Sequence, residues 1–234
     1  MLKLAAFDID GTLKVERDPY VYLHRRLGVM AQAEAITQAG LSGQISYEEW
    51  LRADAMLWRG TPRSTLEQFF RENVYVPGAR ETVQALQSCG VHVVLLSAGL
   101  LLHAEMVAAD LGIAHAFGNE IFFTDSVGTG SDGPDSYGDA VVSGEVQAHV
   151  PVGGKGVVLA RLQAELGIAP EETLAVGDTR SDVDMFARAA VSVAVNPACS
   201  EVADAADIVL PALDLHPLLP RLHAHAPQFW SWRS

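Results

Sequence analysis

The feature that most constrains the fold of this chain is a set of short apolar runs that alternate with helix-like segments. The apolar runs cover residues 3–9, 91–96, 173–177, 191–195 and 207–210. The segments with apolar residues at helical spacing are 78–88, 101–111, 156–166 and 182–190. Buried parallel strands have short continuous apolar sequences, and strands that alternate with helices form parallel sheets. The pattern therefore predicts an α/β fold with a doubly wound, Rossmann-like parallel sheet.

Residues 14–76 interrupt this alternation with helix-like stretches and no convincing strand. A chain of 234 residues that is 49% hydrophobic is long enough for one core and a small inserted subdomain. We therefore expect a core of residues 1–13 and 77–234 with an inserted helical cap over 14–76. The stretch 124–144 is rich in Gly, Ser and Asp, so it is expected to be a loop or hairpin flap.

The charge of the chain limits its partners. The 16 basic and 29 acidic residues give a formal net charge of −13, which repels nucleic acid and anionic membrane surfaces.

The N-terminal apolar run stops at Asp8, too early for a signal peptide, and the longest apolar stretch, 91–102, is too short to span a membrane. We expect a cytoplasmic protein without nucleic-acid or membrane partners.

Two pairs of carboxylates follow predicted strands. The motif DIDGT at residues 8–12 places Asp8 and Asp10 after the first strand, and GDTRSD at 177–182 places Asp178 and Asp182 after a later one. Asp and Gly also form turns and Asp caps helices, so either motif alone has a purely structural interpretation. In a doubly wound sheet, however, such strand ends meet at one crevice. Carboxylates gathered there repel one another without a cation, and Mg²⁺ prefers oxygen ligands.

Two further positions are suited to a phosphate group. Ser97 and Ala98 follow the apolar run 91–96, and Lys155 stands in the glycine-rich turn VGGKG before a predicted helix. A hydroxyl and neighbouring backbone N–H groups bind phosphate oxygens, and an ammonium neutralises them. A Ser-containing turn or a single Lys is more often structural or solvated when it stands alone. Their order relative to the two acidic motifs is what favours a functional interpretation.

Taken in order, DIDGT, Ser97, Lys155 and GDTRSD resemble the four motifs of the haloacid dehalogenase superfamily, over residues 4–210. The helical insertion and the sequence FGNEIFF before Lys155 resemble the phosphoserine phosphatase branch of that superfamily. The resemblance implies that Asp8 is a nucleophile that attacks phosphorus and that Asp10 is the general acid and base.

The resemblance also implies a set of ligands for Mg²⁺ and phosphate. The metal would be held by Asp8, the main-chain carbonyl of Asp10 and Asp178, with Asp182 orienting this shell or the nearby lysine. The groups that would bind the transferring oxygens are Thr12, Ser97, Ala98 and Lys155.

The implied function is a Mg²⁺-dependent phosphatase that hydrolyses a small phosphorylated metabolite through an aspartyl-phosphate. Asp10 favours this activity, because dehalogenases resemble this fold but lack a second acid. A phosphoserine phosphatase proper and a phosphomutase are alternatives within the superfamily. A receiver-like signalling domain and a catalytically dead phosphate-binding protein are the non-enzyme alternatives, although receivers lack a helical insertion after the first strand.

The residues expected in the cap indicate that one substrate is disfavoured. Phosphoserine phosphatases carry an acid shortly after the first motif and an Arg on a cap helix, and alignment places Arg17 and Asp54 at these positions. Because Asp54 would repel a substrate carboxylate, we predict that phosphoserine is not preferred. An alignment shifted by one or two residues would instead use Glu16 and Arg52. Oligomeric state stays open at this level.

Overall fold

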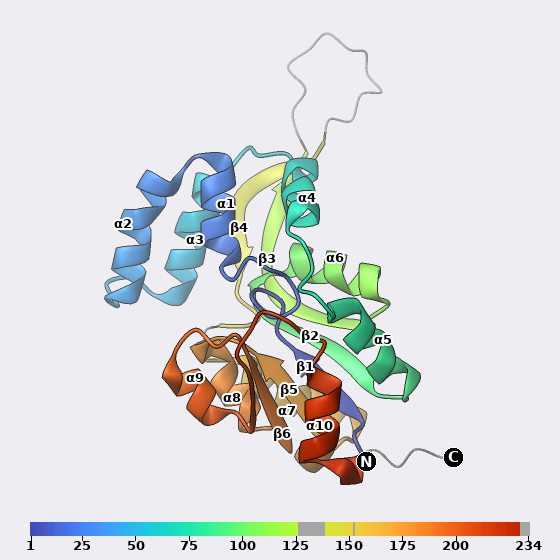
Figure 1. Cartoon of the computed structure of the whole chain (residues 1–234). Coiled ribbons are helices and arrows are strands. Elements are labelled where there is room, and N and C mark those ends of the chain that lie inside the picture. The colour runs from blue at the N-terminus through green and yellow to red at the C-terminus, as the bar shows by residue number, and fades with distance from the viewer. Residues whose placement is uncertain (126–138, 152, 230–234) are drawn as a thin grey trace.

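The computed structural model describes residues 1–125, 139–151 and 153–229, and within them one sheet carries helices on both faces (Figure 1). The strands are β1 (Leu4–Phe7), β2 (His92–Leu100), β3 (His115–Thr124), β4 (Val141–Gln147), β5 (Thr173–Gly177), β6 (Val191–Val195) and β7 (Ile208–Leu210). The helices are α1 (Pro19–Leu27), α2 (Met30–Leu41), α3 (Tyr47–Leu57), α4 (Arg63–Glu72), α5 (Ala79–Ser88), α6 (Leu101–Leu111), α7 (Lys155–Leu166), α8 (Val183–Phe186), α9 (Ser200–Ala205) and α10 (Leu218–His225). The predicted α/β class is confirmed.

The strand order β4-β3-β2-β1-β5-β6-β7 places the first strand in the middle of the sheet. β1 pairs in parallel with β2 on one side and with β5 on the other. The chain therefore runs outward in both directions from β1, as a doubly wound sheet requires. In such a sheet the carboxyl ends of β1, β2 and β5 lie side by side at one edge.

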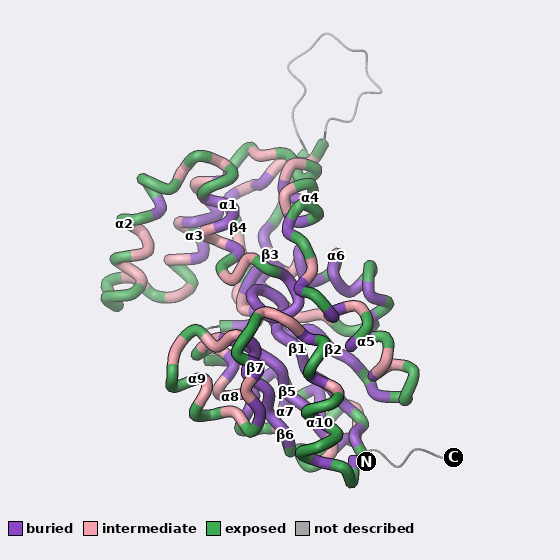
Figure 2. The backbone as a smooth tube through the Cα atoms, in the orientation of Figure 1, coloured by how far each residue is buried: buried purple, intermediate pink, exposed green. Residues whose placement is uncertain are grey.

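The sheet buries apolar side chains on both faces, which explains the continuous apolar runs of the sequence. In β1, Ala5 and Phe7 belong to one core cluster and Leu4 and Ala6 to the other. The first cluster is covered by α5, α6 and α10, and the second by α7, α8 and α9. Figure 2 shows the central strands as buried and the outer turns of the surrounding helices as exposed.

Strands β3 and β4 were not expected from the sequence. They pair antiparallel, as in a hairpin, and both alternate buried with more exposed positions instead of forming an unbroken apolar run. Of the stretch 124–144 expected to be a loop or hairpin flap, Thr124 ends β3 and 141–144 begin β4. Residues 126–138 of that stretch lie outside the described residues.

Helices α1 to α4 occupy most of the insertion between β1 and α5, beyond the carboxyl edge of the sheet (Figure 1). Local signals fix their ends. Asp18 caps α1 by accepting hydrogen bonds from two backbone N–H groups, and Ser46 and Glu49 form a capping box at α3. The helices share a third apolar cluster with β3 and β4, in which Trp58 and Val142 are buried. The β3–β4 pair therefore supports the helices of the insertion.

Among the described residues, no helix is long and apolar enough to cross a bilayer.

Candidate active site

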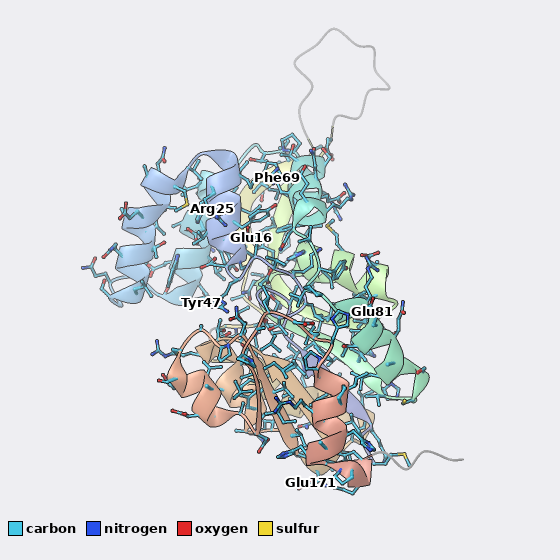
Figure 3. All side chains as sticks on the ribbon, viewed as in Figure 1. Glu16, Arg25, Tyr47, Phe69, Glu81 and Glu171 are labelled. Atoms are coloured by element: carbon cyan, nitrogen blue, oxygen red, sulfur yellow. The ribbon has the colours of Figure 1, made fainter. Side chains whose placement is uncertain are left out.

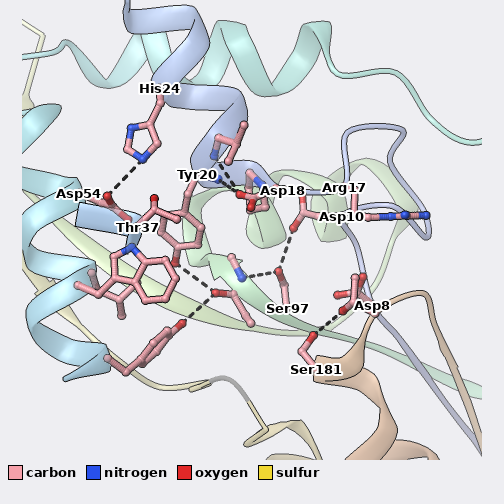
Figure 4. A pocket seen from close by; sticks show the side chains of 18 of the residues that line it. Asp8, Asp10, Arg17, Asp18, Tyr20, His24, Thr37, Asp54, Ser97 and Ser181 are labelled. Atoms are coloured by element: carbon pink, nitrogen blue, oxygen red, sulfur yellow. Dashed lines mark hydrogen bonds and ion pairs between the residues drawn. The ribbon is translucent and has the colours of Figure 1, made fainter. Parts of the chain in front are cut away.

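Four carboxylates and one lysine meet at the carboxyl edge of the sheet, and Figure 4 shows two of them, Asp8 and Asp10, at the cavity. Asp8 and Asp10 follow β1, Asp178 follows β5, Asp182 ends a short 3-10 helix just after it, and Lys155 is the first residue of α7. All five are at most 6% exposed. Residues as far apart in the sequence as Asp8 and Asp182 come together here because β1 lies between β2 and β5.

Lys155 joins two of the carboxylates. Its Nζ lies 2.5 Å from Oδ1 of Asp8 and 2.5 Å from Oδ1 of Asp182. The other oxygen of Asp182 accepts hydrogen bonds from the backbone N–H groups of Asp178 (3.0 Å) and Thr179 (2.8 Å). Asp182 therefore contacts both the lysine and the loop that carries Asp178.

Asp178 faces the first motif from the other side. Its Oδ2 lies 2.6 Å from Nε of Arg17. The hydroxyl of Thr12 contacts Oδ2 of Asp8 at 3.3 Å and Oδ1 of Asp178 at 3.4 Å. Gly11 makes this approach possible: its φ is +86°, and a Cβ there would lie 2.2 Å from Oδ2 of Asp178. Thr12, expected to bind phosphate, lies between the two carboxylates.

The cluster holds more negative than positive charge, since four carboxylates face Lys155 and Arg17. Burial, together with repulsion from neighbouring acids and against the attraction of Lys155, raises the pKa of Asp8 to about 7. Burial and then repulsion by Asp8 and Asp182 raise the pKa of Asp178 to about 9. For Lys155 burial alone would lower the pKa, but Asp182 and Asp8 outweigh it and raise the pKa above its usual range.

These observations fit a divalent cation. Carboxylate oxygens of Asp8, Asp178 and Asp182 lie within 4.8 Å of one another, and all three side chains are buried. Oxygen donors of this kind are the ligands that Mg²⁺ prefers. A cation would also offset the surplus negative charge, which adds to burial in raising the pKa values of Asp8 and Asp178.

Asp10 is held on the cavity side of the cluster. Ser97 donates a hydrogen bond from its hydroxyl to Oδ2 of Asp10 at 3.0 Å and accepts one from the backbone N–H of Gly99 at 2.8 Å. Nδ1 of His103 lies 3.1 Å from Oδ1 of Asp10, and its ring stacks on Phe70 of α4 with centroids 4.4 Å apart. Sequence reasoning missed His103, because a histidine on an apolar helix carries no motif.

Ala98 contributes its carbonyl to a second set of contacts. That oxygen accepts hydrogen bonds from the Tyr20 hydroxyl (3.2 Å), the Tyr47 hydroxyl (3.4 Å) and Nδ2 of Asn119 (2.7 Å). Asn119 also accepts from the backbone N–H groups of His149 and Val150, so it ties the segment before α7 to β3. Asn119 was also missed from the sequence, although it stands in the FGNEIFF segment.

A cavity of about 340 Å³ connects the carboxylate cluster with the helices of the insertion. Its lower end is lined by Asp8, Asp10, Ser97, Ala98 and Lys155. Its upper end is lined by Tyr20, His24, Tyr47, Trp50, Leu51 and Asp54. Figure 3 shows Tyr47 at the junction of the helical part and the sheet part. A ligand with a phosphate at the lower end would place its remaining atoms among these cap side chains.

The four cap residues singled out from the sequence divide into two groups. Arg17 and Asp54 line the cavity. Arg17 is engaged there, since it pairs with Asp178 and also donates to the carbonyl of Asn196 at 2.5 Å. Glu16 forms an ion pair with Arg25 on α1 (Figure 3). Arg52 is exposed, and neither Glu16 nor Arg52 lines the cavity.

Comparison with known proteins gives a consistent family. Residues 5–187 match the family of haloacid dehalogenase-like hydrolases. The chain is 29% identical over 219 residues to a phosphoserine phosphatase of Methanocaldococcus jannaschii, covering 93% of this chain and 96% of that one. It is 33% identical to one of Idiomarina loihiensis, covering 86% of each. It also matches 47% of the length of a longer phosphoserine phosphatase of Mycobacterium tuberculosis, at 31% identity over 87% of this chain.

Solved structures give the same result. A phosphoserine phosphatase described as a phospho-aspartyl intermediate analogue superposes with a TM-score of 0.76 at 27% identity, covering 94% of this chain and 98% of that one. A substrate-bound phosphoserine phosphatase complex superposes with the same TM-score at 26% identity and the same coverage.

Proposed function

The chain belongs to the haloacid dehalogenase-like hydrolase family and is a phosphatase, and we propose that it hydrolyses a small phosphate monoester through an aspartyl-phosphate formed on Asp8. The observation that carries this proposal is the buried cluster in which Asp8 and Asp182 share Lys155 beside Asp178. Family and relatives favour an enzyme over the receiver-like and phosphate-binding alternatives.

Asp8 is the nucleophile in this proposal. One of its oxygens is held by Lys155 and the other accepts from Thr12, so the carboxylate is fixed at the lower end of the cavity. An oxygen of Asp8 attacks phosphorus as the bond from phosphorus to the alcohol oxygen breaks. The Lys155 ammonium neutralises part of the negative charge on the transferring oxygens.

Asp10 is the proton carrier in both half-reactions. It lines the cavity, and Ser97 and His103 hold its two oxygens in place. In the first half-reaction Asp10 gives its proton to the leaving alcohol oxygen. In the second it takes a proton from the water that cleaves the aspartyl-phosphate, which returns Asp8 to its starting state. Ser97, besides orienting Asp10, is placed to bind a phosphate oxygen.

The metal site follows from the same cluster. Asp8, Asp178 and the main-chain carbonyl of Asp10 would hold Mg²⁺, which supplies positive charge that lets an anionic phosphate approach the Asp8 carboxylate. Asp182 keeps Asp178 and Lys155 in position through its four contacts.

Phosphoserine is not the preferred substrate in this proposal. Among the described residues that line the cavity, the basic side chains are Arg17, His24 and Lys155, and the Arg and Lys are both engaged with site carboxylates. The upper end instead presents Asp54, which is 2% exposed and repels a substrate carboxylate. Glu16 and Arg52, the alternative recognition pair, lie outside the cavity.

The proposal is tested by phosphate release from a panel of phosphate monoesters with purified protein and Mg²⁺. We expect turnover of several small esters, with kcat/KM for phosphoserine below that of esters lacking the amino-acid carboxylate. Acid quenching with ³²P-labelled substrate should leave label on the protein that hydroxylamine removes, as an acyl phosphate requires. Absence of phosphate release from every ester would overturn the function, and a clear preference for phosphoserine would overturn the substrate argument.

A further inference from the structure

The upper end of the cavity contains a buried carboxylate with an incomplete set of partners. Asp54 on α3 is 2% exposed, and its Oδ1 has no hydrogen-bond partner within the described residues. The nearest basic group is Nε2 of His24 on α1, 3.2 Å away (Figure 4). A buried carboxylate is stabilised either by a cation or by several hydrogen bonds. The charge of His24 therefore decides whether the protein itself neutralises Asp54.

Trp58 fixes how His24 meets Asp54. Nε1 of Trp58 lies 3.1 Å from Nδ1 of His24, and an indole N–H only donates. Nδ1 must therefore accept, which leaves Nε2 as the ring nitrogen that carries a proton and faces Asp54. Trp58 is 1% exposed and its ring lies 5.4 Å from that of His24, so packing holds this arrangement. Asp54 consequently meets one ring nitrogen of His24, and no Lys or Arg side chain among the described residues pairs with it.

Aromatic side chains line the same cavity as this carboxylate. The Tyr20 ring stacks on Trp58 with centroids 5.8 Å apart, and the hydroxyls of Tyr20 and Tyr47 are both anchored on the Ala98 carbonyl next to Ser97. Both tyrosines keep their protons, because burial raises the pKa of Tyr20 well above its usual range and that of Tyr47 to about 12. Their rings therefore connect the phosphate end of the cavity to the Asp54 end.

Trp50 completes the aromatic lining from α3. It packs against Gly40 of α2, where an added Cβ would lie 2.2 Å from the indole ring. Aromatic faces attract cations through the negative charge above each ring, and they do so best where water is excluded. The remaining charged groups that face the cavity add no free cation, since Asp18 and Asp10 are acidic and Arg17 pairs with Asp178.

We infer that the upper end of the cavity binds an ammonium group, so that the substrate is a phosphate monoester of an amino or quaternary ammonium alcohol without a carboxylate. This inference rests on the proposed function, because the ester phosphate is placed on Asp8. Asp54 supplies the opposite charge, and Tyr20, Tyr47 and Trp50 supply the ring faces. A cavity of about 340 Å³ has room for a small headgroup of this kind.

A pair of substrates with the same shape tests the inference. Choline phosphate and 3,3-dimethylbutyl phosphate differ in one atom, nitrogen against carbon, and hence in one positive charge. With Mg²⁺ present, kcat/KM for choline phosphate should exceed that for the carbon analogue by about tenfold or more. Ethanolamine phosphate against n-propyl phosphate makes the same comparison for a primary ammonium. Equal rates within both pairs, or faster hydrolysis of the uncharged ester, would overturn the inference.

Two variants on the same helix locate the effect. Asp54→Asn should bring the choline to dimethylbutyl ratio close to one. Glu48→Gln, which removes the same charge from an exposed position of α3, should leave the ratio and the rates as in the wild type. An unchanged ratio in Asp54→Asn would contradict the assignment of Asp54. If circular dichroism shows that Asp54→Asn is unfolded, the ammonium site is judged from two other ratios. The choline to dimethylbutyl ratio should be high in the wild type and lower in Trp50→Leu.

The phosphatase activity and the ammonium site can be tested separately. p-Nitrophenyl phosphate carries no ammonium group, so its hydrolysis reports on the phosphatase activity alone. Turnover of this ester without any preference within the matched pairs would leave the phosphatase in place and remove the ammonium site. Absence of turnover with every ester would remove the phosphatase itself.

Discussion

Replacing Asp8 by Asn is expected to abolish turnover and to stabilise the metal-free protein at the same time. Asn keeps the shape of the side chain, and its Oδ1 still accepts a hydrogen bond from Lys155, which lies 2.5 Å from Asp8 Oδ1. It has neither the charge nor the reactivity of a carboxylate. We expect kcat to fall by at least about 10³-fold, because removing a nucleophile removes the covalent route.

The stability effect follows from the pKa of Asp8. Burial raises this pKa to about 7, so the folded state binds the proton more tightly than the unfolded state does. Ionised Asp8 therefore lowers the free energy of unfolding as pH rises from about 4 to 7, by about 1.4 kcal/mol per pKa unit. The raised pKa also depends on the neighbouring acids and on Lys155, so the effect of one substitution is only part of the total. We expect Asp8→Asn to raise the free energy of unfolding by about 1–4 kcal/mol at pH 8.

Thermal unfolding in EDTA at pH 5 and pH 8 measures this difference. One kcal/mol corresponds to about 2–4 °C in a protein of this size, so Asp8→Asn should raise Tm by several degrees at pH 8 and by less at pH 5. Asp204→Asn, at an exposed position of α9, is the matched control and should change Tm little at either pH. Residual activity above about one-hundredth of the wild-type rate, or a Tm gain that is independent of pH, would refute the reasoning.

Three further predictions concern the metal and the cavity. Activity should be lost in EDTA and restored by Mg²⁺, whereas Ca²⁺ should inhibit because its looser coordination misplaces the nucleophile. Activity in EDTA, or equal rates with Ca²⁺ and Mg²⁺, would contradict the assignment of the metal site. Because the raised pKa values of Asp8 (about 7) and Asp178 (about 9) make the metal-free protein less stable as pH rises from about 4 to 9, Mg²⁺ should raise Tm more at pH 9 than at pH 6. Gly40→Ala should displace Trp50 and raise KM for choline phosphate. Gln38→Ala, at an exposed position of α2, is the control and should leave KM unchanged. An unchanged KM in Gly40→Ala would show that Trp50 does not contact the bound headgroup.

The sequence by itself predicted the parallel core and the edge of the sheet at which its acidic motifs meet. Strands β1, β5, β6 and β7 were readable because strands buried on both faces need short, continuous apolar sequences. The acidic motifs could be located because each directly follows such a strand, and parallel strand ends meet at one edge. The half-buried strands β3 and β4 were not readable, since glycine and polar residues interrupt their apolar positions and they pair antiparallel at the end of the sheet.

Only the tertiary structure decided which side chains face one another across long stretches of sequence. The contacts of His103 with Asp10, of Arg17 with Asp178 and of His24 with Asp54 each depend on how a helix or loop packs against another element. Local sequence fixes where a strand ends, because propensity and burial act over a few residues. Which groups share a cavity, and whether a carboxylate there is neutralised, depends on packing between distant segments, and no short motif records it.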